Sequence, residues 1–136
     1  MVESICILVV DDNPAMADTL ADILEVKGFI VHAAASGAEA LEILREQPVD
    51  ILLTDVKIPN MNGLELFQKA RKLCPQLITI FMTAYSADEL IQQGMAEGVK
   101  TVLTKPLEIN FMLHLFSAYK KELMESQADR FRGHKG

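Results

Sequence analysis

The sequence predicts an α/β fold in which five parallel strands form one sheet, with helices on both of its faces. Short runs rich in Ile, Val, Leu and Phe alternate with longer amphipathic segments along the chain, and this alternation is typical of repeated βα units. The apolar runs are continuous rather than alternating with polar residues, as expected for strands buried on both faces.

The predicted elements follow one another in strict alternation. We expect strands near residues 4–10, 29–34, 49–54, 77–82 and 100–104, and helices near residues 14–27, 37–46, 63–73, 86–97 and 107–124. Right-handed crossovers leave few ways to order such strands. The order expected at this chain length is flavodoxin-like, 2-1-3-4-5, in a doubly wound sheet. Its switch point then lies between the first and third strands.

Local signals mark several predicted helix ends. Pro14 suits the first position of a helix, with Asn13 as its N-cap. Glycine suits the left-handed backbone that ends many helices, and it follows two predicted helices, at Gly28 and Gly98. Ser-x-x-Glu sequences predict capping boxes at two helix starts, namely Ser36 with Glu39 and Ser86 with Glu89.

Composition limits the class of protein. A chain of 136 residues that is 50% hydrophobic is large enough for one domain with a real core, and its net charge of -6 argues against a nucleic-acid binder. We see no apolar run near the roughly 20 residues of a membrane span, and no signal peptide. The two cysteines make no disulfide framework. We expect a cytoplasmic domain over residues 1–124 and a polar tail or linker over 125–136.

Acidic residues directly follow two of the predicted strands. Asp11 and Asp12 end the first apolar run, and Asp55 ends the third. These two strands flank the predicted switch point, where open α/β sheets bind ligands. Adjacent carboxylates repel each other unless a cation joins them, and Mg²⁺ prefers such oxygen ligands. The alternative for Asp11 and Asp12 alone is a polar turn in which Asp12 caps a helix.

The same edge of the sheet also offers a nucleophile, a hydroxyl and a cation. The Asp55 carboxylate, ionised at neutral pH, can attack phosphorus without a neighbouring base. Thr83 and Ala84 end the fourth strand, where a hydroxyl can bind a phosphoryl oxygen, and Lys105 ends the fifth, where its charge offsets repulsion between anions. The bond between Lys105 and Pro106 is a candidate cis peptide. An ordinary strand-end threonine and a surface lysine are the simpler alternatives.

Four motifs in order resemble the receiver domain of bacterial two-component response regulators, of the chemotaxis-regulator kind, over residues 4–119. They are LVVDDN at 8–13, LTDVKIPNMNG at 53–63, MTA at 82–84 and KP at 105–106. Each motif is moderately specific, whereas the four together at this spacing are very specific.

The resemblance implies a role for each matched residue. Asp55 corresponds to the phospho-acceptor. Its carboxylate would bind Mg²⁺ or Mn²⁺ together with the remaining implied ligands, which are Asp11, Asp12 and the backbone carbonyl of Lys57. The phosphoryl group would contact the lysine and the switch residues, which are Thr83, Ala84 and Lys105. Residues Pro59, Gly63 and Pro106 would shape the site.

The resemblance also implies partners. The donor would be a sensor histidine kinase, a phosphotransfer protein or a small phosphodonor. Phosphorylation would change the surface of the fourth helix, fifth strand and fifth helix for a downstream protein or output domain, or for a homodimer. Such a chain is a switch rather than an enzyme with turnover, with no membrane or nucleic-acid partner of its own.

Three features depart from the family pattern or bear on its output. Receivers commonly carry an aromatic residue where this chain has Val102, so the route from Asp55 to the surface is an open question. An apolar stripe along the fifth helix, ending at Tyr119 and Leu123, fits either core packing or a partner surface. Gly94 lies inside the fourth helix, where glycine costs roughly 1 kcal/mol.

Three other functions fit these residues less well. A phosphohydrolase that uses an aspartyl phosphate, like the haloacid dehalogenases, would need a second Asp at the position of Lys57. A receiver fold kept only for docking would not need the complete acidic and basic set. A flavodoxin would need a Ser/Thr-rich phosphate loop after the first strand. The phospho-accepting switch is therefore the favoured function.

Overall fold

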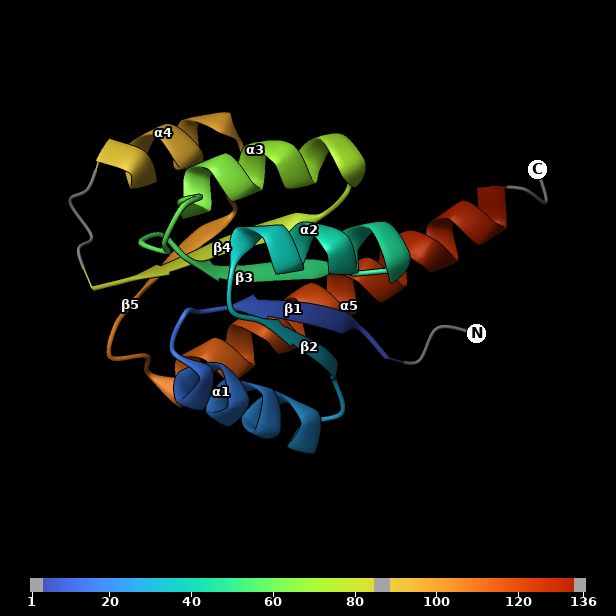
Figure 1. Ribbon diagram of the computed structural model, residues 1–136. Coiled ribbons are helices and arrows are strands. Elements are labelled where there is room, and N and C mark those ends of the chain that lie inside the picture. The colour runs from blue at the N-terminus through green and yellow to red at the C-terminus, as the bar shows by residue number, and fades with distance from the viewer. Residues whose placement is uncertain (1–3, 85–88, 134–136) are drawn as a thin grey trace.

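Five parallel strands form the sheet in the order β2-β1-β3-β4-β5 (Figure 1). The computed structural model describes residues 4–84 and 89–133, with side chains up to residue 125. The strands are β1 (Cys6–Val10), β2 (Ile30–Ala34), β3 (Ile51–Asp55), β4 (Ile78–Thr83) and β5 (Thr101–Thr104). The predicted order is confirmed, and it puts the strands that end in acidic residues next to each other.

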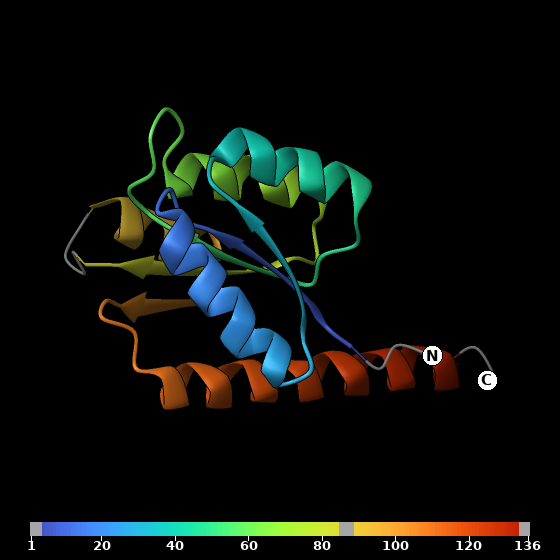
Figure 2. The ribbon, with the colours of Figure 1, turned by 60° about the horizontal axis from the view of Figure 1, so that its bottom comes forward.

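The helices cover both faces of this sheet. They are α1 (Pro14–Val26), α2 (Gly37–Glu46), α3 (Gly63–Leu73), α4 (Glu89–Glu97) and α5 (Ile109–Gly133). Helices α1 and α5 lie on one face and α2, α3 and α4 on the other, as Figures 1 and 2 show. Within the described residues, none of these helices combines the length and the apolar character that a membrane span needs.

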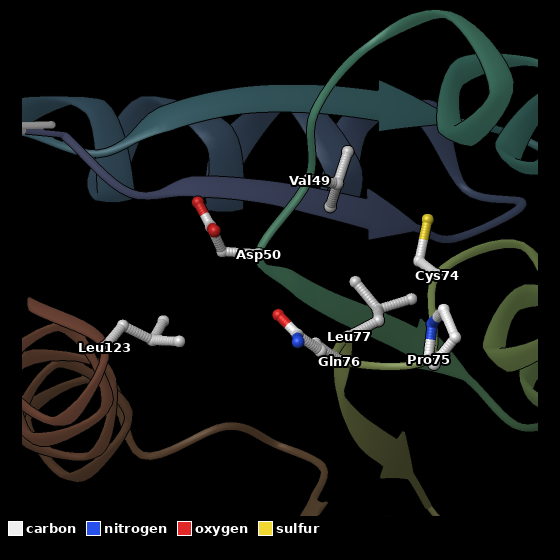
Figure 3. A pocket seen from close by; sticks show the side chains of 7 residues that line it. All are labelled: Val49, Asp50, Cys74, Pro75, Gln76, Leu77 and Leu123. Carbon is white, nitrogen blue, oxygen red and sulfur yellow. The ribbon is translucent and has the colours of Figure 1, made fainter. Parts of the chain in front are cut away.

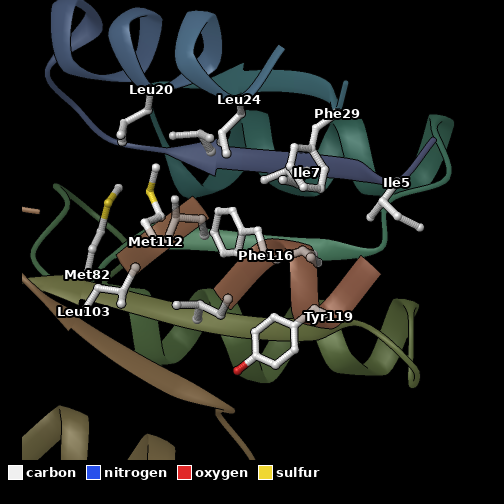
Figure 4. Close-up of a cluster of buried hydrophobic side chains, with 14 of the residues drawn as sticks. Ile5, Ile7, Leu20, Leu24, Phe29, Met82, Leu103, Met112, Phe116 and Tyr119 are labelled. Carbon is white, nitrogen blue, oxygen red and sulfur yellow. The ribbon is translucent and has the colours of Figure 1, made fainter. Parts of the chain in front are cut away.

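Alternate residues of each strand face opposite layers of helices. In β1, Ile7 and Val9 join the core under α1 and α5, whereas Leu8 and Val10 join the core under α2 and α3. Figure 4 shows the first of these cores, where Phe116 of α5 lies beside β1 and packs edge-on against Phe29. All four of these β1 side chains are 0% exposed, so burial on both faces explains the continuous apolar run.

Most predicted helix ends are confirmed. The Asn13 side chain accepts hydrogen bonds from the backbone of α1, and Gly28 and Gly98 have positive φ angles of 94° and 123°. Ser36 caps α2 through the Glu39 amide at 3.2 Å. The Glu39 carboxylate, however, accepts from the amide of residue 35 rather than of Ser36, so only half of that capping box forms. The second predicted box involves Ser86, which lies outside the described residues.

Helix α5 is longer than predicted. The sequence indicates an end near residue 124, where the apolar stripe stops, but the helix continues to Gly133. Residues 125–132 contain good helix formers and no proline or glycine, so the helix runs on after its described packing contacts end. The predicted polar tail is thus helical up to Gly133.

Candidate functional site

Side chains from three strands meet at the carboxyl edge of the sheet because strand periodicity gives them the same direction. Each lies two residues beyond a member of the core under α1 and α5, and alternate residues of a strand share a face. The pairs are Val9 with Asp11, which directly follows β1, Leu53 with Asp55 at the end of β3, and Leu103 with Lys105, which directly follows β5. The parallel register places Asp11 level with Asp55 and Lys105 two residues beyond that level, and the long Lys105 side chain still contacts both carboxylates.

Three carboxylates form the acidic part of the site. One oxygen from each of Asp11, Asp12 and Asp55 lies within 4.8 Å of the other two. Asp11 is buried, with one oxygen accepting the Asn13 amide at 2.9 Å, while Asp12 is exposed and Asp55 is half-buried. The predicted cluster is therefore present, open to solvent on its Asp12 side.

Lys105 joins two of these carboxylates. Its Nζ lies 2.7 Å from Asp55 Oδ2 and 3.2 Å from Asp11 Oδ2. Burial by itself lowers the pKa of Lys105, but the hydrogen bonds and charges of Asp55 and Asp11 outweigh it and hold the pKa above its ordinary value. The ammonium is thus charged at neutral pH. The bond between Lys105 and Pro106 is cis, as predicted.

The charge of the site suits a divalent cation. Three carboxylates face one ammonium, which leaves two negative charges. Mg²⁺ is a hard cation that takes oxygen ligands and retains several waters. The exposed Asp12 leaves room for those waters, so the donor set and its charge both fit the ion.

The loop after β3 shapes the floor of the site. The Lys57 amide donates to Asp55 Oδ1 at 3.2 Å, which orients the carboxylate. The Met61 amide donates to the Pro59 carbonyl at 2.8 Å, across Asn60 with its φ of 71°. The role of the Lys57 carbonyl as a metal ligand stays a prediction.

Gly63 is held against the same loop. Its amide donates to the Val56 carbonyl at 2.8 Å. A Cβ at this position would lie 2.7 Å from the Asp55 carbonyl oxygen and 2.9 Å from Val56 Cα. Backbone atoms cannot yield as a flexible side chain can, so α3 approaches the loop after β3 this closely only because residue 63 is glycine.

The predicted switch residues lie on the neighbouring strands. Thr83 is fully buried, and its carbonyl accepts the Lys105 amide at 2.7 Å. Asp55 pairs with Met82 in the β3/β4 register, so Thr83 is one residue beyond the level of Asp55. Ala84 is exposed, and residues 85–88, including the rest of the predicted responding loop, lie outside the described residues.

Two structural features of the site region were missed from the sequence. Asn62 and Glu65 form a complete capping box at the start of α3, with bonds of 2.9 and 3.2 Å. The Asn-x-x-Glu spacing is a local signal that could have revealed it. The second is a close approach of Gly94 to Phe81, between residues too far apart in the chain for any local signal.

A pocket lies at the edge of the sheet opposite the acidic cluster (Figure 3). It has a volume of about 360 Å³ and is lined by Val49, Asp50, Cys74, Pro75, Gln76, Leu77 and Leu123. Asp50, which precedes β3, already accepts the Cys6 amide at 2.9 Å. Because parallel strands bind ligands at their carboxyl ends, the acidic edge is the better candidate site.

The comparisons with known proteins agree with this site. A family model described as the response regulator receiver domain matches residues 7–117. The chain belongs to the response regulator receiver family. Receivers act in two-component signalling and phosphorelays, and they bind Mg²⁺ in an acidic pocket. The acidic cluster of this receiver is formed by Asp11, Asp12 and Asp55.

The receiver is similar to several curated proteins. It is 39% identical to a response regulator receiver protein of Anaeromyxobacter sp. (strain Fw109-5), over 79% of this chain and 45% of that protein. It is 32% identical to the sensor histidine kinase RcsC of Salmonella typhimurium, over 93% of this chain and 13% of the kinase. It is 33% identical to sporulation initiation phosphotransferase F of Bacillus subtilis, over 76% of this chain and 84% of that protein. The receiver thus spans less than half of the first two relatives.

Solved structures have the same fold. A CheY-like response regulator receiver domain protein from Methanospirillum hungatei JF-1 is 31% identical, with a TM-score of 0.86 over 91% of this chain and 99% of that one. A response regulator protein from Burkholderia pseudomallei, solved with a phosphorylated aspartic acid, a calcium ion and citrate, is 27% identical. Its TM-score is 0.75, over 89% of this chain and 74% of that one.

Proposed function

We propose that this receiver accepts a phosphoryl group on Asp55 from a histidine kinase or a phosphotransfer protein, and that it does so with bound Mg²⁺. The observation that carries the proposal is the placement of Lys105. Its ammonium lies 2.7 Å from the Asp55 carboxylate, within a cluster of three carboxylates. The calcium ion and phosphorylated aspartate named for the Burkholderia relative support it.

The chemistry follows from the charges of the site. A carboxylate oxygen of Asp55 attacks phosphorus, and a bond from phosphorus to this oxygen forms as the bond to the donor imidazole nitrogen breaks. The imidazole keeps the electron pair and takes up a proton. Mg²⁺ would supply charge neutralisation, held by Asp11, Asp12, Asp55 and the carbonyl of Lys57. The Lys105 ammonium is hydrogen-bonded to Asp55 Oδ2. After transfer it would pair with a phosphoryl oxygen instead.

The same charges favour a switch over an enzyme with turnover. Position 57, two residues after the acceptor, is a lysine and offers no carboxylate to activate water. Hydrolysis of the acyl phosphate therefore lacks a general base at this position. We expect the phosphorylated state to persist long enough to be recognised by a partner.

The readout would lie on α4, β5 and α5. The added phosphoryl charge of about -1.5 to -2 draws the Thr83 hydroxyl, and the strand end moves with it. Exposed apolar side chains already lie on these helices, with Met95 46% and Phe111 55% exposed. Phe111 borders a hollow of about 240 Å³ together with Val102 and Pro106. This surface suits a downstream protein or a second copy of the chain.

The test is phosphorylation by acetyl phosphate with Mg²⁺, followed by intact mass. The wild-type protein and Asp22→Asn, which removes an exposed carboxylate from the middle of α1, are expected to gain one phosphoryl group. Asp55→Asn and wild-type protein in excess EDTA are expected to gain none. Sedimentation of the phosphorylated and unmodified forms then shows whether the readout is a dimer or a surface for another protein.

Three results would contradict the proposal. Phosphoryl gain that survives in Asp55→Asn would place the acceptor elsewhere. No gain by the wild-type protein, with no binding of beryllofluoride, would favour a docking role without phosphorylation. Repeated turnover of phosphate esters would instead favour the phosphohydrolase.

A further inference from the structure

Thr83 and Phe81 share one face of β4. Ile80 and Met82 belong to the core under α1 and α5, whereas Phe81 belongs to the core under α3 and α4. Since residues two apart in a strand point the same way, Thr83 continues the face of Phe81. Both side chains are 0% exposed. The switch hydroxyl and the ring are therefore consecutive on the side of the sheet that α4 covers.

The Phe81 ring fills a notch in α4. A Cβ on Gly94 would lie 2.5 Å from Phe81 Cε2 and 3.0 Å from Cζ. These distances are too short for any side chain, so the ring occupies the space that every residue except glycine would use. Gly94 is therefore more than a weak point in the helix. It allows α4 to pack directly on the ring.

The ring has little freedom to move away. Phe67 of α3 packs edge-on against it, with ring centroids 6.5 Å apart and an interplanar angle of 86°. Val102 is its cross-strand partner in the β4/β5 register. The position that is commonly aromatic in receivers therefore lies beside the Phe81 ring. Close-packed interiors transmit displacement rather than absorb it.

The C-terminal end of α4 is held separately. Glu97 accepts hydrogen bonds from Gln68 at 3.1 Å and from Arg71 at 3.0 Å, both on α3. The Arg71 guanidinium also donates to the Glu97 carbonyl at 2.9 Å and lies over the Phe67 ring. Hydrogen bonds from Gln93 and Gln68, with the charge of Arg71, hold the pKa of Glu97 below its ordinary value. This clasp ties the last turn of α4 to α3.

We infer that Phe81 couples Thr83 to α4 through the Gly94 notch, while the Glu97 clasp anchors the end of the helix. A shift at the end of β4 then moves the middle and first turn of α4 relative to an anchored last turn. Phe81 acts as a positioning residue and does not touch the phosphoryl group. The inference rests on the proposed function, since it needs a phosphoryl-driven shift of Thr83.

The test is amide exchange with Mg²⁺ and beryllofluoride, compared with Mg²⁺ alone, on the wild type and Phe81→Leu. In the wild type, protection of residues 89–94 is expected to change and residues 96–98 to change less. In Phe81→Leu the change over 89–94 is expected to fall to about half or less, because neighbours fill the lost volume only partly. Intact mass after acetyl phosphate must show that Asp55 is still phosphorylated.

Phe29→Leu is the matched control. It removes a buried ring from the core under α1 and α5, on the opposite face of the sheet from α4. It is expected to keep the wild-type response of α4. An equal loss in both variants would assign the effect to general loosening and overturn the specific role of Phe81.

Failure of the inference can be told apart from failure of the function. A wild type that takes up no phosphoryl group contradicts the proposed function. A wild type that is phosphorylated while α4 stays unchanged, or a Phe81→Leu variant that responds fully, contradicts the inference alone.

A second measurement tests the contact itself. Gly94→Ala is expected to lower the urea midpoint, and Phe81→Leu to recover part of that loss in the double variant, since leucine leaves room for the methyl group. Strictly additive effects would show that the ring and residue 94 do not meet, and would overturn the inference.

Discussion

Lys105 is the residue on which the charge balance of the site depends. Its ammonium is hydrogen-bonded to Asp55 and Asp11, two of the three carboxylates that would hold the metal. The lysine and a divalent cation therefore compete for the same oxygens. After phosphorylation the same ammonium would be free to neutralise the phosphoryl group. The Lys105 side chain would thus weaken Mg²⁺ binding and assist transfer of the phosphoryl group to Asp55.

Lys105→Met should separate these two effects. Removal of a positive charge from beside the ion is expected to tighten Mg²⁺ binding roughly ten-fold. Phosphorylation by acetyl phosphate should slow by about 100-fold or more, because a charge that stabilises the transition state is lost. Calorimetric titration and the rate of mass gain measure the two.

Lys100→Met is the control for the lysine substitution. Lys100 precedes β5 at its other end, with its Nζ 6.0 Å from the Tyr119 ring centroid. This variant makes the same change in net charge and should leave both quantities unchanged. Weaker Mg²⁺ binding in Lys105→Met would show that the lysine supports the metal instead of competing with it.

At the scale of the element, β1 shows how strand burial alters chemistry. Cys6 is 6% exposed, and its amide is held by the Asp50 carboxylate at 2.9 Å. Burial, and then the negative charge of Asp50, raise the pKa of this thiol to about 11. A thiol that stays neutral in the folded chain but ionises in the unfolded chain makes stability depend on pH.

The sign follows from proton binding. Between pH 9.0, where an unperturbed thiol ionises, and about pH 11, the folded state holds the Cys6 proton and the unfolded state releases it. Stability is therefore complete below pH 9.0 and is lost as pH rises through this window. From about pH 8 to about pH 10 the contribution of the Cys6 thiol to the free energy of unfolding should fall by about 1 kcal/mol.

Urea unfolding of the wild type and Cys6→Ala measures this loss. The variant lacks the thiol, so its free energy of unfolding should decrease less between the two pH values than that of the wild type. Cys74→Ala, in the loop between α3 and β4, should behave like the wild type. Parallel curves for the wild type and Cys6→Ala would show that the thiol does not contribute.

At the scale of the whole molecule, α5 both completes the core and extends beyond it. Met112, Phe116 and Tyr119 are buried against the sheet, and the Tyr119 hydroxyl shares a hydrogen bond of 2.6 Å with Thr101 of β5. The apolar stripe along α5 fits either core packing or a partner surface by sequence, and the structure shows that it belongs to the core up to Tyr119. Leu123 packs at the edge of this cluster and is its last member among the α5 side chains that the structure describes, which end at residue 125.

Truncation separates the two parts of α5. A chain that stops after Glu125 keeps the whole cluster and should match the full chain in free energy of unfolding to within about 0.5 kcal/mol. A chain that stops after Ser117 loses the Tyr119 and Leu123 contacts and should lose at least about 2 kcal/mol. Urea unfolding measures both. Marked destabilisation of the longer chain would show that residues 126–136 support the domain.

Much of this molecule could be predicted from local patterns. Strand order, the acidic edge and the cis bond before Pro106 follow from apolar periodicity and from the residues that end each strand. The spacing of apolar residues and the type of residue that ends each strand depend on residues close together in the chain, so both can be recognised in the sequence. The prediction of where α5 ends was wrong because it used the end of the apolar stripe, whereas residues 125–132 contain good helix formers that continue the helix.

What the sequence by itself determined is the kind of site: three carboxylates and a lysine at the carboxyl ends of parallel strands. Only the tertiary structure decided how that site is connected to the rest of the molecule. The Lys105 bridge, the approach of Gly63 to the acceptor loop and the seat of Phe81 in the Gly94 notch each join residues that are distant or poorly patterned in the chain. Such contacts depend on how whole elements pack, and packing is set by side-chain volumes across the interior rather than by local propensity.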